Sequence, residues 1–226
     1  PQPVRTQILV GAHNCPLWEA DKPQMWANIL KHPERTPALG FYAQENPEVA
    51  DWETKRAWVS YAFDEFEKSG YTVTSAYTVV KNPDKIKFVY RDMLWEGADM
   101  IASGVASFGH LGGIHYQNQA DILPYMETVE RGESPIFRAY ATSPDERFIR
   151  EFILKLKLGT VKPSYYKKKF GEDVLVRFAS QLKWMEDEGF ASVVGDEIKL
   201  TRDGLLQVDR LLHEFFLPHH RTNRYV

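Results

Sequence analysis

The residues best suited to chemistry lie in one short stretch, 104–118, where histidines, amides and aromatic side chains alternate with glycines. Four glycines occur between Gly104 and Gly113. Glycine is favoured where the backbone needs a positive φ, or where a ligand must approach it with no Cβ in the way. His110 and His115 can exchange protons near neutral pH and can ligate haem iron. The stretch predicts a ligand-binding loop, with a glycine-rich surface connector as the alternative.

The spacing of these histidines is not one known for metal sites, so we expect no metal site in this chain. Loop histidines are more often hydrogen-bonded surface residues than ligands. His219, His220 and Arg221 are interpreted as a basic tail. Asp99, just before the glycine-rich stretch, is expected to accept hydrogen bonds from nearby backbone amides.

The elements that must position this loop follow a mixed pattern. The apolar run Met100–Ala106 predicts a buried strand leading into the loop. Asp51–Ser69 has a helical period and ends at Gly70, a helix stop. Tyr71–Val80 is β-branched, aromatic or small, which predicts one strand, and Arg5–Val10 predicts another. Strands alternating with helices predict an α/β fold.

The remaining elements of this first part are less regular. Leu17–Asn46 is rich in proline and is expected to be irregular. A turn is expected at residues 82–84, and residues 85–94 fit either a strand or a short helix. Residues 120–131 look helical despite Pro124.

A second unit begins after a break at residues 132–135. Ser143 is a helix N-cap, Pro144 fits the first turn, and Glu146 completes a capping box, so a helix is expected to run to Leu158. The later elements are two helices, a hairpin and a last helix, at Pro163–Phe170, Val174–Glu188, Phe190–Leu200 and Thr201–Phe216. This order is winged-helix-like, and it places the domain boundary at residues 132–143.

Composition narrows the function classes. The chain has 226 residues, 43% hydrophobic and 26% charged, typical of a globular protein. Its net charge of -3 argues against a general nucleic-acid or membrane-surface role. With no apolar run of membrane-spanning length and no signal pattern, a cytoplasmic location is expected.

A winged helix nevertheless raises DNA binding as an alternative. The basic patch consists of six lysines: Lys155, Lys157, Lys162, Lys167, Lys168 and Lys169. Arginine, which pairs with guanine, is absent between Gly159 and Gly171. A solvated lysine face is the commoner explanation, so we expect no nucleic-acid partner.

A family resemblance rests on the order of several motifs. The run Gly104-Val105-Ala106-Ser107-Phe108-Gly109 is followed by Tyr116-Gln117-Asn118, a helix, a Gly-Glu-x-Pro turn, the capping box with Arg147, and the winged-helix-like tail. Over roughly Trp52–Phe216, this order resembles the C-terminal half of oxygen-independent coproporphyrinogen III dehydrogenase and its relatives. These are radical S-adenosylmethionine enzymes that act mostly on tetrapyrroles.

The resemblance implies a fold and a site. Residues 1–131 would be the distal part of a (β/α) barrel, 132–143 a linker, and 144–226 a winged-helix-like domain. The residues implied to lie beside S-adenosylmethionine are Gly104, Val105, Ala106, Ser107, Phe108 and Gly109. Those implied to line the tetrapyrrole cleft are His110, Gly112, Gly113, His115, Gln117 and Asn118.

The iron–sulfur cluster of that family has no ligands in this chain. The family holds a [4Fe-4S] cluster with three cysteines in a CxxxCxxC motif, whereas this chain has one cysteine, Cys15. Without a cluster, S-adenosylmethionine cannot be cleaved reductively. The chain is therefore expected either to belong with a missing N-terminal radical half or to have lost catalysis. Haem or porphyrin binding without turnover, methyl transfer and haem breakdown are the alternatives.

Overall fold

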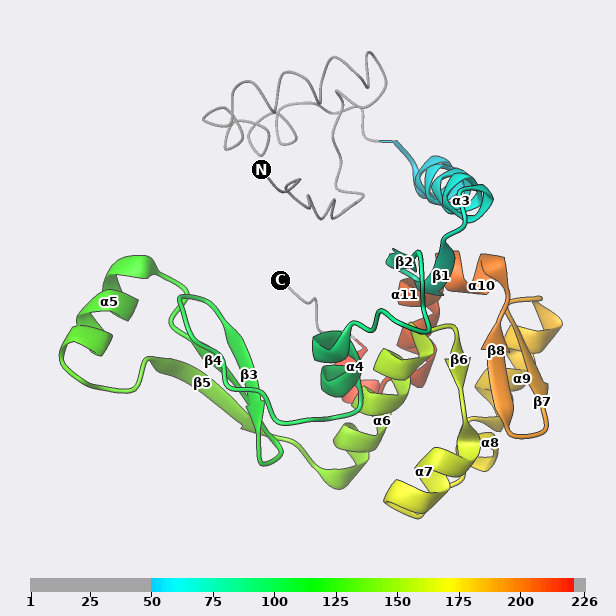
Figure 1. Cartoon of the computed structure of the whole chain (residues 1–226). Coiled ribbons are helices and arrows are strands. Elements are labelled where there is room, and N and C mark those ends of the chain that lie inside the picture. The colour runs from blue at the N-terminus through cyan, green and yellow to red at the C-terminus, as the bar shows by residue number, and fades with distance from the viewer. Residues whose placement is uncertain (1–49, 222–226) are drawn as a thin grey trace, which may run out of the picture. The chain divides into compact units, whose positions relative to one another are not determined.

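The structure is a computed structural model that describes residues 50–221. The expected strand Arg5–Val10, the irregular segment Leu17–Asn46 and Cys15 lie outside the described residues. The chain divides after Gly70 into two compact units. Figure 1 shows the course of the chain.

The first unit contributes one described helix, α3 (Trp52–Lys68). The Asp51 carboxylate caps it by accepting a 2.7 Å hydrogen bond from the Thr54 amide. Gly70 follows with a φ of +80°, the left-handed conformation that ends helices. The helix predicted over Asp51–Ser69 is confirmed.

The second unit begins with a small hairpin where one strand was predicted. Strands β1 (Thr72–Ser75) and β2 (Thr78–Val80) pair antiparallel and are joined by a turn at residues 76–77. Hydroxyl hydrogen bonds tie the two strands together, Thr78 Oγ1 lying 3.1 Å from that of Thr74 and 2.7 Å from the Ser75 hydroxyl. The prediction of one continuous strand over Tyr71–Val80 was wrong, because local side-chain hydrogen bonds support the reversal.

Helix α4 (Val89–Trp95) resolves the ambiguous segment as a helix, after a turn at residues 83–85. The buried strand expected at Met100–Ala106 is absent, since only Met100 forms a β-bridge, to His110. Ile101 is 78% exposed, and Gly104 and Ala106 have φ values of 100° and 58°. Two residues with positive φ so close together interrupt an extended strand.

A three-stranded sheet follows, in the order β3–β4–β5, from strands β3 (Phe108–Leu111), β4 (Ile114–Asn118) and β5 (Ile136–Ala141). Helix α5 (Ile122–Glu130) connects β4 to β5, as Figure 1 shows, and confirms the helix predicted there. Strand β5 of this sheet lies within residues 132–143, the segment expected to be a linker. All strand pairs among residues 50–221 are antiparallel, so the parallel pairing of a (β/α) barrel is not seen in that part of the chain.

The C-terminal part is mostly helical, and its start agrees with the sequence. Helix α6 (Pro144–Leu156) opens with the predicted capping box, in which Ser143 and Glu146 exchange hydrogen bonds. Strand β6 (Thr160–Val161) and helix α7 (Pro163–Phe170) follow. The helix predicted over Pro163–Phe170 is confirmed.

The helix predicted over Val174–Glu188 is instead two helices, α8 (Val174–Arg177) and α9 (Ala179–Asp187). Phe178 between them leaves the helical conformation, with a φ of -108° and a ψ of 24°. Its ring is 4% exposed and packs 4.8 Å from Phe152 and 5.0 Å from Phe215. Core packing of this ring therefore outweighs the continuous helical period.

The predicted hairpin is confirmed as β7 (Ala191–Val194) and β8 (Glu197–Leu200), with β6 on the other side of β8. The single last helix is divided into α10 (Arg202–Leu206), α11 (Val208–Leu211) and the 3-10 turn η3 (Leu212–Phe215), and a further 3-10 turn, η4 (Pro218–His220), follows. The main hydrophobic core lies among these elements and includes Phe148, Phe152, Leu156, Tyr166 and Met185. No helix among residues 50–221 is long and apolar enough to cross a bilayer.

Candidate functional site

The glycine-rich stretch is a β-hairpin. Strands β3 and β4 pair in register, with Gly109 opposite Tyr116 and His110 opposite His115. Gly112 and Gly113 form the two-residue turn with φ values of 58° and 80°, as a type I′ turn requires. The Gly112 amide donates a 2.9 Å hydrogen bond to the Asp99 carboxylate, which confirms the capping role expected for Asp99.

The glycines differ in what surrounds them. A Cβ at Gly109 would collide with the ring of Tyr116, and one at Gly113 would lie 2.6 Å from Nη1 of Arg147. A Cβ at Gly112 would meet open space. Packing against the Tyr116 ring therefore explains Gly109, and the positive φ values of the turn explain Gly112 and Gly113.

The polar residues at the end of β4 hold the preceding loop. The Asn118 side chain donates to the carbonyl of Gly104 at 3.0 Å, and that of Gln117 donates to the carbonyl of Ala106 at 3.3 Å. Gln117 also accepts a 2.8 Å hydrogen bond from Arg138. These two amides, expected to contact a substrate, serve intramolecular hydrogen bonds.

The residues expected beside S-adenosylmethionine form the loop and first strand residues 104–109. Gly104 donates its amide to the Tyr125 hydroxyl at 3.0 Å, and Ser107 donates its hydroxyl to the carbonyl of Ser103 at 2.9 Å. Gly109 is buried, whereas Val105 and Phe108 are 37% and 43% exposed. The side chains of Val105 and Phe108 therefore give this segment an apolar surface that a ligand could contact.

One face of the hairpin carries three rings. Phe108 stacks on His115 with centroids 5.6 Å apart and planes 10° apart, and His110 lies 6.1 Å from His115. The three belong to one face because they alternate along paired strands. This cluster of Phe108, His110 and His115 is called the ring cluster below.

Both histidines of the ring cluster are held in the neutral form. Burial lowers the pKa of His110 and of His115, and the positive charge of Arg150 lowers both further. The Nδ1 atom of each ring is buried without a hydrogen-bond partner. Unpaired buried polar atoms are uncommon in proteins, so these nitrogens are candidates for contact with a ligand or water.

A cleft of about 230 Å³ lies beside His110. It is bounded by the β3–β4 hairpin, by Gly97 two residues after α4, and by residues of α6 and α7. Its lining consists of Gly97, His110, Arg147, Arg150, Glu151, Lys169 and Phe170. This space is called the arginine cleft below.

The charges of the arginine cleft are unevenly satisfied. Lys169 pairs with Oε2 of Glu151 at 2.7 Å. The other carboxylate oxygen, Oε1, is buried and has no hydrogen-bond partner. Arg147 and Arg150 make no hydrogen bond or ion pair through their side chains with another described residue. Burial lowers the pKa of Arg150, although a guanidinium stays charged at neutral pH. The cleft therefore offers two guanidinium groups without a hydrogen bond or ion pair in the described part of the chain, although the Glu151 charge attracts that of Arg150.

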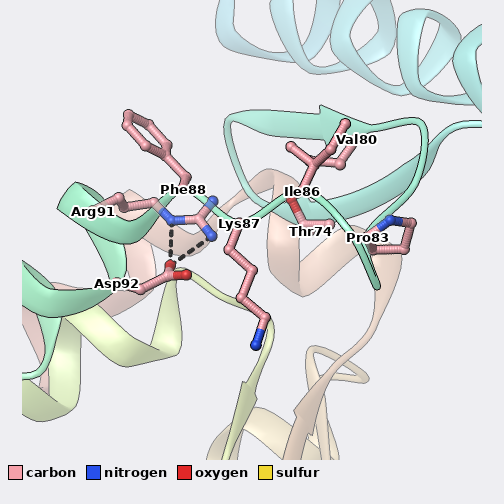
Figure 2. Close-up of a pocket in the computed structure, with 8 residues that line it drawn as sticks. All are labelled: Thr74, Val80, Pro83, Ile86, Lys87, Phe88, Arg91 and Asp92. Atoms are coloured by element: carbon pink, nitrogen blue, oxygen red, sulfur yellow. Dashed lines mark hydrogen bonds and ion pairs between the residues drawn. The ribbon is translucent and has the colours of Figure 1, made fainter.

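A second pocket, of about 270 Å³, lies between the β1–β2 hairpin and α4, and Figure 2 shows its lining. Its arginine, Arg91, is already bonded to the Asp92 carboxylate at 2.7 and 2.8 Å and to Thr78 at 2.7 Å. Because this guanidinium is satisfied by its neighbours, the pocket is a weaker candidate than the arginine cleft.

Glu146, His219 and His220 bring three potential metal-ligand atoms within 4.8 Å of one another. The Glu146 carboxylate already accepts from the Tyr140 hydroxyl at 2.6 Å and from the Ser143 amide at 2.7 Å, and lies 2.7 Å from the His220 ring. We assign this group a structural role, since it joins β5, the start of α6 and η4. The expectation of a basic tail at His219–Arg221 missed this contact.

Sequence reasoning also missed Arg147, Arg150 and Glu151, which were treated only as helix residues. All three lie on α6, at spacings that place them on one side of the helix. Only the packing of α6 beside the hairpin shows what they line.

The comparisons with known proteins bear on this arrangement. No family model matches the chain. Over 120 residues, 51% of the chain, it is 28% identical to proteins of two Helicobacter pylori strains, both named oxygen-independent coproporphyrinogen III oxidase. The fold is similar to that of a coproporphyrinogen III oxidase from Escherichia coli described as a radical SAM enzyme, with a TM-score of 0.62 and 18% identity over 80% of this chain.

The chain resembles these oxidases. The resemblance predicted from its motifs is thereby confirmed, and the mixed α/β class with it. The match spans 26% of each curated relative and 45% of the solved structure. The reaction and substrates of the complete oxidases are therefore a matter of proposal for this chain.

Proposed function

We propose that this chain is the C-terminal portion of a radical S-adenosylmethionine enzyme that acts on a tetrapyrrole, in the manner of oxygen-independent coproporphyrinogen III oxidase. The observation that carries the proposal is the agreement of two comparisons, one in sequence and one in fold, on oxidases of the same name. The family relationship makes oxidative decarboxylation of coproporphyrinogen the favoured reaction, ahead of methyl transfer or haem breakdown.

In this proposal the ring cluster and the arginine cleft face the substrate. A tetrapyrrole is flat and apolar with charged substituents, and the described surface offers matching chemistry. Phe108 and Val105 supply exposed apolar contact, and Arg147 and Arg150 supply cations nearby. Residues 104–109 are proposed to lie beside S-adenosylmethionine, and within this segment we assign the contact to Val105 and Phe108.

The iron–sulfur cluster does not fit this chain by itself. A radical S-adenosylmethionine cluster needs three thiolates, and the sequence contains the single thiol of Cys15. In this proposal the cysteines come from another segment, a radical half that this chain does not include. We also propose that residues 144–217 form a winged-helix-like domain and that the barrel belongs with the radical half.

A second candidate is a protein that binds haem or a porphyrin without turning it over. The single cysteine favours it, because binding through the ring cluster and the arginine cleft needs no cluster. The two candidates share one binding surface and differ in the chemistry that a partner segment supplies.

The experiment measures two quantities on this polypeptide. Coproporphyrin III binding is followed by absorbance, and S-adenosylmethionine cleavage by 5′-deoxyadenosine formation after anaerobic reconstitution with iron and sulfide. We expect porphyrin binding without 5′-deoxyadenosine. Adding the radical half of a relative in trans should restore cleavage for an enzyme portion and leave it absent for a binding protein. Formation of 5′-deoxyadenosine by this polypeptide alone would overturn the cysteine argument.

A further inference from the structure

We propose that the arginine cleft binds a single carboxylate substituent of the ligand, held by Arg147 and Arg150 with the His110 ring as a third donor. The proposal rests on the proposed function for the identity of the ligand. The cleft itself is argued from its own charges and unpaired atoms, which do not depend on that function.

The charge of the cleft selects an anion. Of its four charged side chains, Lys169 and Glu151 pair with each other at 2.7 Å. The two that remain, Arg147 and Arg150, have no hydrogen-bonding or ion-pairing partner among the described residues. An unpaired guanidinium beside a cleft favours an incoming negative group, and its planar fork matches a carboxylate in two parallel hydrogen bonds.

The third donor is His110, which comes from strand β3, whereas both arginines come from α6. Its side chain is 4% exposed, it lines the cleft, and its Nδ1 has no partner. Burial lowers the His110 pKa, so the ring is neutral at pH 7, and one tautomer presents Nδ1–H as a donor. Because Nδ1 has no exposed surface in this orientation, a rotation of the ring toward the cleft would bring it to a bound carboxylate and satisfy it.

Glu151 distinguishes a carboxylate from a more highly charged anion. Its side chain is 3% exposed, and its Oε1 is unpaired within the same cleft. A fixed carboxylate repels a dianion more strongly than a monoanion, and this repulsion is not screened by solvent in a buried site. A carboxylate is therefore preferred over a phosphate group.

The volume limits what enters. Clefts that hold drug-sized molecules usually measure about 300 to 1,000 Å³, whereas the arginine cleft measures about 230 Å³. A macrocycle does not fit, but one carboxylate-bearing arm does. The ring of a tetrapyrrole would then lie outside the cleft, on the side of Phe108.

The test compares porphyrins that differ only in their carboxylates. Coproporphyrin III and its methyl ester are titrated against the wild-type chain and the variants Arg147→Gln, Arg150→Gln and Lys168→Gln. Lys168 is the matched control, because it is an exposed cation on α7 that does not line the cleft. We expect each arginine variant to weaken coproporphyrin binding by about tenfold or more, with Lys168→Gln unchanged and the ester insensitive to all three. Equal affinity of the wild type and both arginine variants would overturn the proposal.

A second arm separates this proposal from the proposed function. Propionate and inorganic phosphate are titrated separately while the His110 ring is observed by NMR. A shift with propionate that is lost in Arg150→Gln supports the cleft even if no porphyrin binds, in which case the tetrapyrrole assignment fails alone. No shift with propionate, or a stronger response to phosphate, overturns the carboxylate proposal. Thermal melting of each variant verifies that it is folded.

Discussion

The side-chain amide of Asn118 donates a 3.0 Å hydrogen bond to the backbone carbonyl of Gly104, and it lies 3.4 Å from the carbonyl of Ala102. Asn118 is 2% exposed, so this contact is shielded from water. The last residue of β4 thus fixes the irregular loop that leads into β3. Asn118, which is expected to line the tetrapyrrole cleft, therefore also holds this loop in place.

Replacing Asn118 by Ala should therefore lower stability more than it lowers ligand affinity. Leaving buried carbonyls without their donor costs about 1 to 3 kcal/mol, which urea unfolding measures directly. Gln117→Ala is the matched control, because Gln117 is only half-buried and both of its hydrogen bonds, to Ala106 at 3.3 Å and from Arg138 at 2.8 Å, are exposed to solvent. Equal losses of stability in the two variants would argue against a special role of Asn118 in holding the loop.

Gly109 and Tyr116 should be energetically coupled. A Cβ at position 109 would meet the Tyr116 ring, which is 8% exposed and has little room to move. We expect Gly109→Ala to cost about 1 to 3 kcal/mol in the wild type and much less in a Tyr116→Ala background. Gly112→Ala is the control, because that site is strained by its φ of 58° but open, and its cost should be the same in both backgrounds.

The contact between Glu146 and its donors predicts a pH dependence. Burial by itself would raise the pKa of Glu146, but hydrogen bonds from Tyr140, Ser143 and His220 outweigh this effect and lower the pKa from 4.5 to about 2. The unfolded chain therefore binds the proton more readily than the folded chain. Stability from this group is fully present above about pH 4.5 and is lost as the pH falls toward 2.

Melting temperatures of the wild type and Glu146→Gln, measured from pH 7 to pH 2, examine this directly. The wild type should be the more stable at pH 7, and the difference should shrink on acidification. Other carboxylates with a lowered pKa, such as Asp196, contribute equally to both proteins and cancel. A difference that stays constant over this range would contradict the prediction.

Local rules explain which elements the sequence could predict. Some helix ends could be predicted because their signals lie within one helical turn. Examples are the capping box at Ser143 and the glycines that follow α3 and α7. Phe178 illustrates the limit, because its helix break depends on rings that are distant in sequence.

The site shows the same division. The glycines and two histidines in the sequence drew attention to residues 104–118, which form the β3–β4 hairpin and the loop before it. Glycine, however, favours both a ligand-binding loop and a tight hairpin turn, so the sequence did not distinguish the two. Arg147 and Arg150 could not be recognised, since their role depends on α6 packing beside β3. Residues that converge from separate elements leave no mark in a local pattern.

The last prediction is that the chain binds duplex DNA only weakly, with a shallow salt dependence. Four of the six lysines of the basic patch are paired with acids. Lys155 contacts Glu96, Lys157 contacts Asp209, Lys167 contacts Asp173 and Lys169 contacts Glu151, at 2.7, 2.9, 3.7 and 2.7 Å. The Lys155 and Lys157 side chains are only 13% and 19% exposed, so they cannot easily turn toward a phosphate.

Two lysines of the patch, Lys162 and Lys168, have no ion pair of their own among the described residues. If both contacted phosphates, the logarithm of the binding constant would fall with the logarithm of salt concentration with a slope of about -2, since each contact contributes about -0.9. Fluorescence anisotropy with a labelled duplex at several salt concentrations measures this slope, and Lys162→Gln with Lys168→Gln should flatten it further. A steep slope with tight binding would contradict the prediction, because it would mean that the ion pairs open on DNA and that residues 144–217 bind it.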